Sequence, residues 1–235
     1  MLVQNPSGNS NSITLNGRPF SGAVVSDKGY DITHARFEHP IPLDAGLAAA
    51  ARHVVAAGRT VHAIAGFELR IPGPLTTADF DSFNQRYVAR LTDLGLAVEG
   101  AVPAARTNVA PTVAGVSEPS VYAVSYTSPD RRGCPAFVLS GVPETAPSDT
   151  ATMLDSIMGV LSGRLEEIGA SWDDATAIQL YGVDDLQDLL VDRVLVRAGK
   201  AAVHGIHWFP SLPPVQGMKL EIDVRSAGVE LVLPV

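Results

Sequence analysis

The sequence predicts an α+β fold built from two tandem copies of one supersecondary plan. Segments with the apolar spacing of helices alternate with short runs typical of strands, and this order occurs once in each half of the 235-residue chain. A repeat with a period near half the chain indicates two fused domains. At 46% hydrophobic and 18% charged residues, the chain is long enough for two globular domains of roughly 100 to 120 residues each.

The first half contains two predicted helices and two predicted strands. Apolar residues recur at helical spacing in 44–57 and 77–94, and a glycine follows each segment as a stop. The segment 60–71 alternates as a strand does and ends at a Pro-Gly-Pro sequence. A further strand is expected near 120–127. The order is therefore helix, strand, helix, strand.

The second half repeats this order with one more strand at each end. A helix is predicted to begin at Ser148 or Asp149 and to end at Ile168, and a second helix spans 186–199. The predicted strands are 136–140, 175–181, 203–208 and 218–224. Residues 129–133 read as the linker between an N-terminal domain, 1–128, and a C-terminal domain, 134–235. The polar stretch 1–12 is expected to be disordered.

Charge and hydropathy exclude several classes of partner. The formal net charge is -8 and no basic cluster is longer than Arg131-Arg132, so we expect no nucleic-acid partner. There is no apolar run of about 18 residues and no basic, apolar leader, so we expect no membrane association and a cytoplasmic location.

Metal and cofactor chemistry are not predicted. The single cysteine, Cys134, cannot form an internal disulfide or a cysteine-based metal site. His204 and His207 are three residues apart in a predicted strand, so their side chains should point to opposite faces. Because no Gly-rich phosphate loop follows a strand, no organic cofactor is expected either.

The second half contains, in order, Phe137 to Pro143, Gly169 to Asp174, Leu212-Pro213 and Glu221-Ile222-Asp223, and through these segments it resembles the Rid/YjgF (RutC-like) family of enamine and imine deaminases. The similarity lies in a strand that ends in Ser-Gly before a proline, Phe137 to Pro143, and in the Gly-Ala-Ser-x-Asp-Asp sequence from Gly169 to Asp174. A late Leu212-Pro213 and the strand Glu221-Ile222-Asp223 complete it. The first half is similar to the same family through Phe83-Asn84 with Tyr87, and through Pro103 to Thr107.

This resemblance implies two tandem domains of the chorismate-mutase-like, YjgF-type fold. Each would be a mixed sheet backed by two helices, and the domains would assemble into a three-fold barrel with clefts between subunits. A homotrimer of the tandem chain is the expected assembly, because a lone pair of domains would leave sheet edges uncovered.

The resemblance also assigns candidate site residues. Arg106 would hold a substrate carboxylate, since the planar guanidinium suits bidentate binding. Glu221 would accept a proton from the attacking water. The further predicted substrate-binding residues are Asn84, Tyr87, Asn108 and Ser140.

Two departures from the family pattern leave the arrangement of the site open. The predicted strand that should carry an acid in the first half, 120–124, has none, and His204 stands where the second half should have its arginine. In one interpretation Arg106 and Glu221 form a composite site across a domain interface. In the other, His204 and Glu221 are an acid/base pair for a different substrate.

The predicted function is a cofactor-free, hydrolytic deaminase. Its substrate would be a small carboxylate-bearing enamine or imine of the 2-aminomuconate or 2-aminoacrylate type. A non-catalytic, ligand-binding regulatory protein of the same fold is one alternative, because the arginine and the glutamate are split between the two copies. A chorismatase-like hydrolase is another, because chorismatases also contain two halves of this fold.

Overall fold

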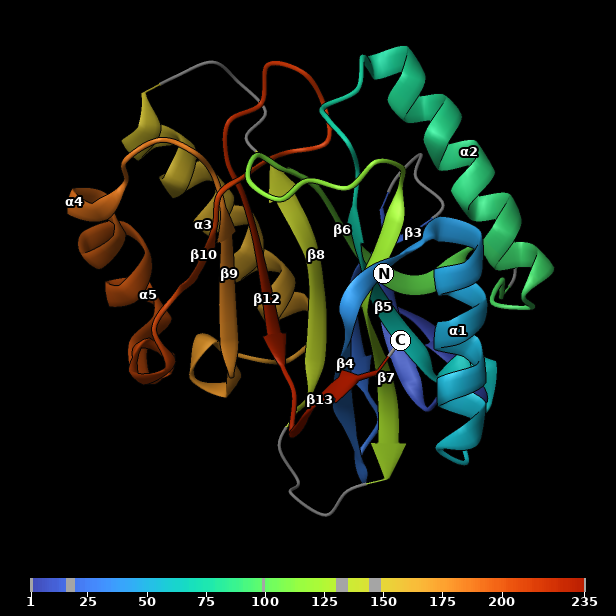
Figure 1. Cartoon of the computed structure of the whole chain (residues 1–235). Coiled ribbons are helices and arrows are strands. Elements are labelled where there is room, and N and C mark those ends of the chain that lie inside the picture. Colours follow the sequence, from blue (N-terminus) through green and yellow to red (C-terminus); the bar gives the residue numbers. More distant parts are fainter. Residues whose placement is uncertain (1, 16–19, 99, 130–134, 144–148, 235) are drawn as a thin grey trace.

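The computed structural model describes residues 2–15, 20–98, 100–129, 135–143 and 149–234 of the chain, which contain both strands and helices (Figure 1). The strands are β1 (Leu2–Asn5), β2 (Ser10–Thr14), β3 (Phe20–Ser26), β4 (Tyr30–Pro42), β5 (Ile64–Arg70), β6 (Val102–Pro111), β7 (Ser120–Pro129), β8 (Phe137–Pro143), β9 (Ala177–Tyr181), β10 (His207–Phe209), β11 (Ser211–Leu212), β12 (Glu221–Ser226) and β13 (Val229–Leu233). The α-helices are α1 (Leu43–Ala56), α2 (Thr77–Asp93), α3 (Thr150–Glu167), α4 (Gln187–Leu190) and α5 (Val196–Ala198). Short 3-10 helices are η1 (Pro6–Gly8), η2 (Val61–Ala63), η3 (Trp172–Asp174) and η5 (Gly199–His204), and η4 (Val191–Leu195) is a π-helical turn.

The strands of both halves belong to one sheet, so the prediction of two tandem YjgF-type domains with separate sheets is wrong. The main path of the sheet runs β10-β9-β12-β8-β3-β6-β5-β7-β4-β13. Strand β3 of the first half pairs antiparallel with β8 of the second, Val24 opposite Val138. The last strand, β13, then returns to the far edge and pairs parallel with β4. These two pairings join segments far apart in the chain, and no local sequence pattern specifies them.

Most of the predicted elements are confirmed, and the N-terminus differs. Helices α1, α2 and α3 and strands β5, β7, β8, β9 and β12 lie where the spacing predicts them, and 187–198 is helical throughout. The segment 203–208 is only partly a strand, because η5 extends to His204. The stretch 1–12, expected to be disordered, contains β1 and β2. It is held by β2–β3 pairing and by Asn5, which donates to the His62 carbonyl at 2.9 Å.

The domain boundary at 129–133, the cytoplasmic location and the homotrimer stay predictions. Residues 130–133 and Cys134 lie outside the described residues. No helix in the described part of the chain is long and apolar enough to cross a membrane.

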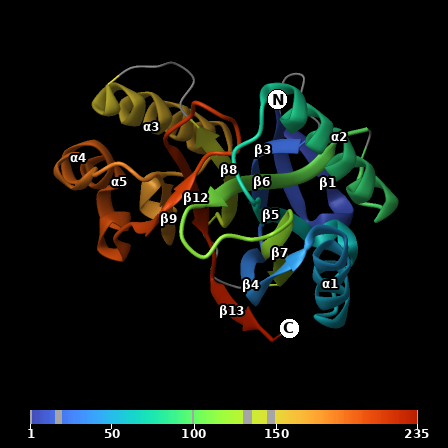
Figure 2. The ribbon, with the colours of Figure 1, turned by 45° about the horizontal axis from the view of Figure 1, so that its top comes forward.

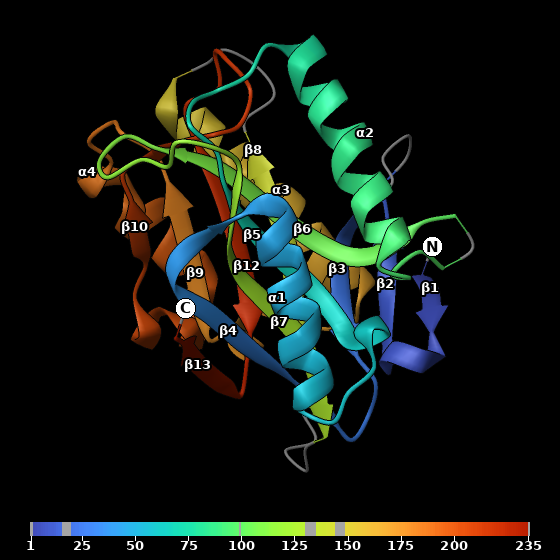
Figure 3. The ribbon, with the colours of Figure 1, turned by 45° about the vertical axis from the view of Figure 1, so that its right-hand side comes forward.

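Two apolar cores lie under the two groups of helices. Helices α1 and α2 lie across strands β4 to β7 (Figure 3), and α3 to α5 lie at the other end of the sheet (Figure 2). The first core includes Leu47, Phe67 and Tyr87, and the second includes Leu161 and Val224. The large aliphatic and aromatic side chains on the helix-facing sides of the strands therefore stabilise each end separately.

The opposite face of the sheet carries many polar side chains that are also buried, beside a small apolar cluster. On β5, Glu68 and Arg70 alternate with core residues, and on β9, Gln179 and Tyr181 do the same. Gln179 Nε2 lies 3.1 Å from Glu68 Oε1, although four strands separate β9 from β5 along the sheet. The sheet must therefore curl strongly, so that the polar side chains of β5 and β9, which lie on the same face of the sheet, meet on the inside of the curl.

Candidate functional site

A buried cavity brings together residues from the two halves of the chain. Its volume is about 170 Å³, and it lies between α2, the ends of β6, β8 and β12, and the loop before β12. Its lining residues are Phe20, Thr77, Phe80, Asp81, Arg106, Asn108, Gly141, Pro214, Val215, Met218 and Glu221. Three of the predicted site residues, Arg106, Asn108 and Glu221, therefore share one cavity within one chain.

Arg106 places a buried cation in this cavity. Strand β6 carries it next to α2, and it is 5% exposed. Four aromatic rings surround the guanidinium, the nearest being Phe20 with its centroid 4.2 Å from Cζ. Such rings stabilise a desolvated cation without neutralising it, because the negative face of the ring attracts the charge. Arg106 is therefore kept as a positive group that a substrate anion can use.

Three of the predicted binding residues hold Arg106 and do not line the cavity. Asn84 Oδ1 accepts a hydrogen bond of 2.7 Å from Arg106 Nη1. The ring of Tyr87 lies 5.1 Å from the guanidinium, and burial together with Phe83 stacking fixes its place. Ser140 accepts a 2.9 Å hydrogen bond from the Arg106 backbone N–H and donates to the Ser21 carbonyl. These residues orient the arginine, which is a different role from contact with substrate.

Glu221 reaches the cavity through an irregularity in the sheet. Strand β12 pairs with β8 so that two residues, Ser140 and Gly141, lie opposite the single residue Asp223. Bulges of this kind commonly redirect side chains at sites. A Cβ atom on Gly141 would lie 1.9 Å from Glu221 Oε1, so the carboxyl group occupies the space that a side chain would fill. The bulge at Ser140-Gly141 and the missing side chain of Gly141 thus allow the Glu221 carboxyl group to reach the cavity.

The surroundings of Glu221 favour its protonated form. Burial is the largest effect and the nearby Asp223 adds to it, while Arg106 and a hydrogen bond from the Asn108 backbone N–H act in the opposite direction. The balance raises the pKa of Glu221 to about 8. A carboxyl group that is neutral at pH 7 can donate a proton, as a general acid must.

Asn108 carries the unpaired polar group of the cavity. Its side chain is 2% exposed, and neither Oδ1 nor Nδ2 has a hydrogen-bond partner among the described residues. Leaving a buried amide unpaired costs about 1–3 kcal/mol per group. An unpaired donor and acceptor in a cavity that also contains Arg106 indicates a place prepared for a polar ligand.

His204 is not brought to this cavity. It is exposed at the end of η5, beyond α5, and it is not among the residues that line the cavity. The structure therefore supplies no contact for the His204–Glu221 acid/base pair, whereas it places Arg106 and Glu221 around one volume.

A buried polar network lies next to Glu221 and was not predicted from the sequence. Asp223 accepts hydrogen bonds from Thr107 at 2.6 Å and from Tyr181 at 3.1 Å, and its other oxygen accepts from Gln179 at 2.9 Å. Gln179 also donates to Glu68. The alternation of polar and apolar residues on β5, β9 and β12 was a signal for this layer, but the same alternation is typical of a strand with a solvated face.

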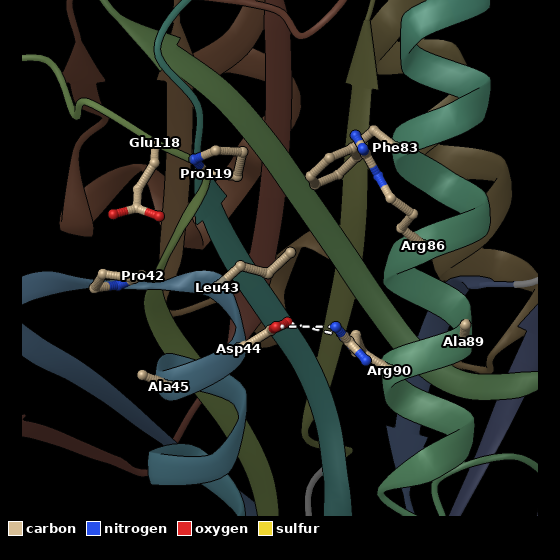
Figure 4. A pocket seen from close by; sticks show the side chains of 10 residues that line it. All are labelled: Pro42, Leu43, Asp44, Ala45, Phe83, Arg86, Ala89, Arg90, Glu118 and Pro119. Atoms are coloured by element: carbon tan, nitrogen blue, oxygen red, sulfur yellow. Dashed lines mark hydrogen bonds and ion pairs between the residues drawn. The ribbon is translucent and has the colours of Figure 1, made fainter.

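A larger cavity is a surface groove elsewhere on the described part of the chain. It measures about 690 Å³ and lies between α1, α2 and the segment before β7 (Figure 4). Exposed Arg90 bonds Asp44 across it at 3.0 and 3.1 Å, and Arg86 and Glu118 also line it. None of the predicted site residues lines this groove. We favour the smaller cavity because two of its charged or ionisable groups, Arg106 and Glu221, are buried, and electrostatic effects are stronger where water is excluded. No group of three or more potential metal-ligating side chains occurs among the described residues.

Comparisons with solved structures give two distant likenesses. A chorismatase crystal structure superposes with a TM-score of 0.47 at 12% sequence identity, covering 88% of this chain and 77% of that chain. A cyanuric acid hydrolase superposes with a TM-score of 0.41 at 13% identity, covering 86% of this chain and 69% of that chain.

Comparison of sequences gives a much stronger relationship, and it corrects the Rid/YjgF resemblance. The model of the 2-aminomuconate deaminase CnbZ family matches residues 2–231. A 2-amino-5-chloromuconate deaminase from Comamonas testosteroni is 33% identical over 233 residues, covering 91% of this chain and 92% of the relative. The match extends over both halves as one unit, where the Rid/YjgF resemblance rested on short motifs in each half. The chain therefore belongs to the CnbZ family, that of 2-aminomuconate deaminase CnbZ.

Proposed function

We propose that this protein is a deaminase that hydrolyses 2-aminomuconate, or a close derivative, to ammonia and a 2-oxo dicarboxylate. The observation that carries the proposal is the pairing of a buried cation, Arg106, with a buried, protonated acid, Glu221, in one cavity of a CnbZ family member. The two groups suit the two demands of the substrate, which is an anion and an enamine. The reaction adds water and breaks a C–N bond, and we propose that proton transfers alone are sufficient, without a cofactor.

Arg106 would bind a carboxylate of the substrate. The aromatic rings and Asn84 hold the guanidinium, whose planar fork of donors matches the two oxygens of a carboxylate. Phe20 and Phe80 line the same cavity together with Pro214, Val215 and Met218. These apolar walls fit the flat part of the conjugated carbon chain that carries only hydrogen atoms.

Glu221 would move protons between the substrate and water. In the first step the protonated carboxyl group gives its proton to a carbon of the conjugated chain, which converts the enamine into an iminium ion. Water then attacks the carbon that bears nitrogen and gives a proton to the Glu221 carboxylate. In the last step Glu221 returns this proton to nitrogen, the C–N bond breaks and ammonia leaves. The hydroxyl group gives its proton to the Glu221 carboxylate as the 2-oxo group forms, which restores the protonated acid.

Asn108 would contact the reacting nitrogen and oxygen. Its free Oδ1 can accept a hydrogen bond from the amino group, and its free Nδ2 can donate to the oxygen added at the same carbon. The substrate would satisfy the two polar groups that the protein leaves unpaired. These two hydrogen bonds would favour the amino-substituted substrate over the same dicarboxylic acid without the amino group.

The proposal is tested by incubating the full chain with 2-aminomuconate at pH 7 and measuring ammonia together with the oxo acid. We expect equal amounts of both, formed faster than in buffer. Release of ammonia from 2-aminoacrylate alone would move the protein to a different substrate. Binding of 2-aminomuconate without turnover, seen as a rise in melting temperature, would favour the ligand-binding alternative.

A pair of arginine variants locates the site. Arg106→Ala should lower kcat/KM about 100- to 1000-fold, because removal of a buried charged partner of a ligand costs roughly 2–5 kcal/mol. The matched variant Arg86→Ala changes the large surface groove and should stay within about 3-fold of wild type. The reverse order of effects would place the reaction in the groove.

A further inference from the structure

Glu221 and Asp223 project from the same face of one strand. They are two residues apart on β12, and residues two apart in a strand share a face. Both carboxyl groups are buried, at 3% and 4% exposed. Glu221 lines the reaction cavity, and Asp223 does not. Asp223 therefore acts on substrate only through its neighbour.

The network around Asp223 stabilises its charged form. Thr107, Gln179 and Tyr181 all donate hydrogen bonds to its two oxygens. Burial and the charge of Glu68 raise the pKa of Asp223, while Thr107, Arg225 and Gln179 lower it, and the balance is a pKa of about 6. At neutral pH Asp223 is thus a fixed negative charge next to Glu221.

Each packed element contributes a charged or titratable group to this pair. Arg106 from β6 and Arg70 from β5 favour the ionised form of Glu221, and Asp223 opposes it. Glu68 of β5 lies beside Asp223, and His34 of β4 lies 3.6 Å from Glu68. Tyr181 comes from β9, and Asp81 of α2 lies at the exposed edge of the cavity.

Among these groups Asp223 is the one whose negative charge opposes ionisation of Glu221. Without that charge, burial alone would have to offset the effect of the two arginines on the pKa of Glu221.

We propose that Asp223 is a positioning residue of the active site, whose fixed carboxylate keeps the neighbouring Glu221 protonated across the pH range in which the deaminase works. The inference rests on the proposed function, and it identifies Asp223 as the group that sets the pH range of the deaminase activity. Above that range Glu221 loses its proton and cannot start the reaction.

The test is the pH dependence of kcat/KM for Asp223→Asn, which keeps the shape of the side chain and removes the charge. We expect the basic limb of the profile to move to lower pH by about one unit or more. Asp223→Glu should return the limb to near its wild-type position. Glu230→Gln removes a charge from the outer partner of Arg225 and should leave the limb in place. An active Asp223→Asn variant with an unchanged limb would overturn the proposal.

A titration by ¹³C NMR of the free protein separates this inference from the proposed function. With labelled carboxyl carbons, the Glu221 signal should titrate at lower pH in Asp223→Asn than in wild type. If that variant does not fold, the wild-type curve decides, because coupled carboxyl groups titrate in two steps and Glu221 should respond when Asp223 ionises. A single-step Glu221 curve would contradict the inference, even in an active enzyme. Absence of ammonia release, with the coupled titration present, would contradict only the proposed function.

Discussion

Two glutamates of this protein are both buried, but at neutral pH one is ionised and the other is protonated. Glu68 and Glu221 are 8% and 3% exposed. Burial raises the pKa of both carboxyl groups. At Glu68, His34, Arg225, Arg70 and a hydrogen bond from Gln179 outweigh it and lower the pKa to about 2. At Glu221 the neighbouring Asp223 adds to burial and the pKa is about 8.

The difference shows that partners decide what a buried acid can do. Glu68 lies 3.3 Å from Arg70 and 3.4 Å from Arg225, so it serves as a permanent counter-ion inside the curled sheet. Glu221 faces a cavity and a like charge, so it keeps a proton that it can give away. One glutamate is therefore assigned to stability and the other to chemistry.

The largest expected effect on stability is that of Glu68→Gln. This variant leaves two buried arginines without their shared counter-ion, and breaking such a pair typically costs about 3–5 kcal/mol of unfolding free energy. Urea unfolding at pH 7 measures it. The control is Glu230→Gln, whose exposed carboxylate also bonds Arg225, and which should cost less than about 1 kcal/mol. Equal effects of the two variants would contradict the role given to Glu68.

The next effect is a loss of stability as the pH rises from 6.5 to 8. The folded pKa of Glu221 is about 8 and the ordinary value is 4.5, so the folded state binds more protons in this range and stability falls until the pH passes 8. Glu68 has finished titrating below this range, and Asp223, with a pKa of about 6, completes only the last part of its titration within it. We expect a decline of roughly 2 kcal/mol in wild type and none from this source in Glu221→Gln. A parallel decline in both proteins would show that Glu221 is ionised at neutral pH.

The smallest effect is predicted for Asn108→Leu. Replacing an unpaired buried amide by an apolar side chain of similar size should raise the unfolding free energy by about 1 kcal/mol. The same variant should lower kcat/KM, because it removes the donor and acceptor offered to substrate. Such a trade of stability against activity is common at functional sites. A variant that is less stable and fully active would show that Asn108 has a structural role.

Local patterns predicted most of the helices and strands, and a family resemblance suggested the candidate site residues, but neither predicted how these residues meet. Helices α1 to α3 follow from their apolar spacing. The pairings of β3 with β8 and of β13 with β4 depend on contacts between distant segments, which no local spacing encodes. The strand of Glu221 and Asp223 looked half solvated, because only the curl of the sheet buries its polar face.

The most direct measurement is the rate of ammonia release from 2-aminomuconate by Glu221→Gln, with its melting temperature recorded on the same sample. The account predicts that kcat falls about 100- to 10,000-fold, because the general acid is lost. It also predicts a melting temperature at pH 7 no lower than that of wild type, since one neutral group replaces another. A folded Glu221→Gln protein that releases ammonia within about 3-fold of the wild-type rate would contradict the assignment of Glu221 as the catalytic acid.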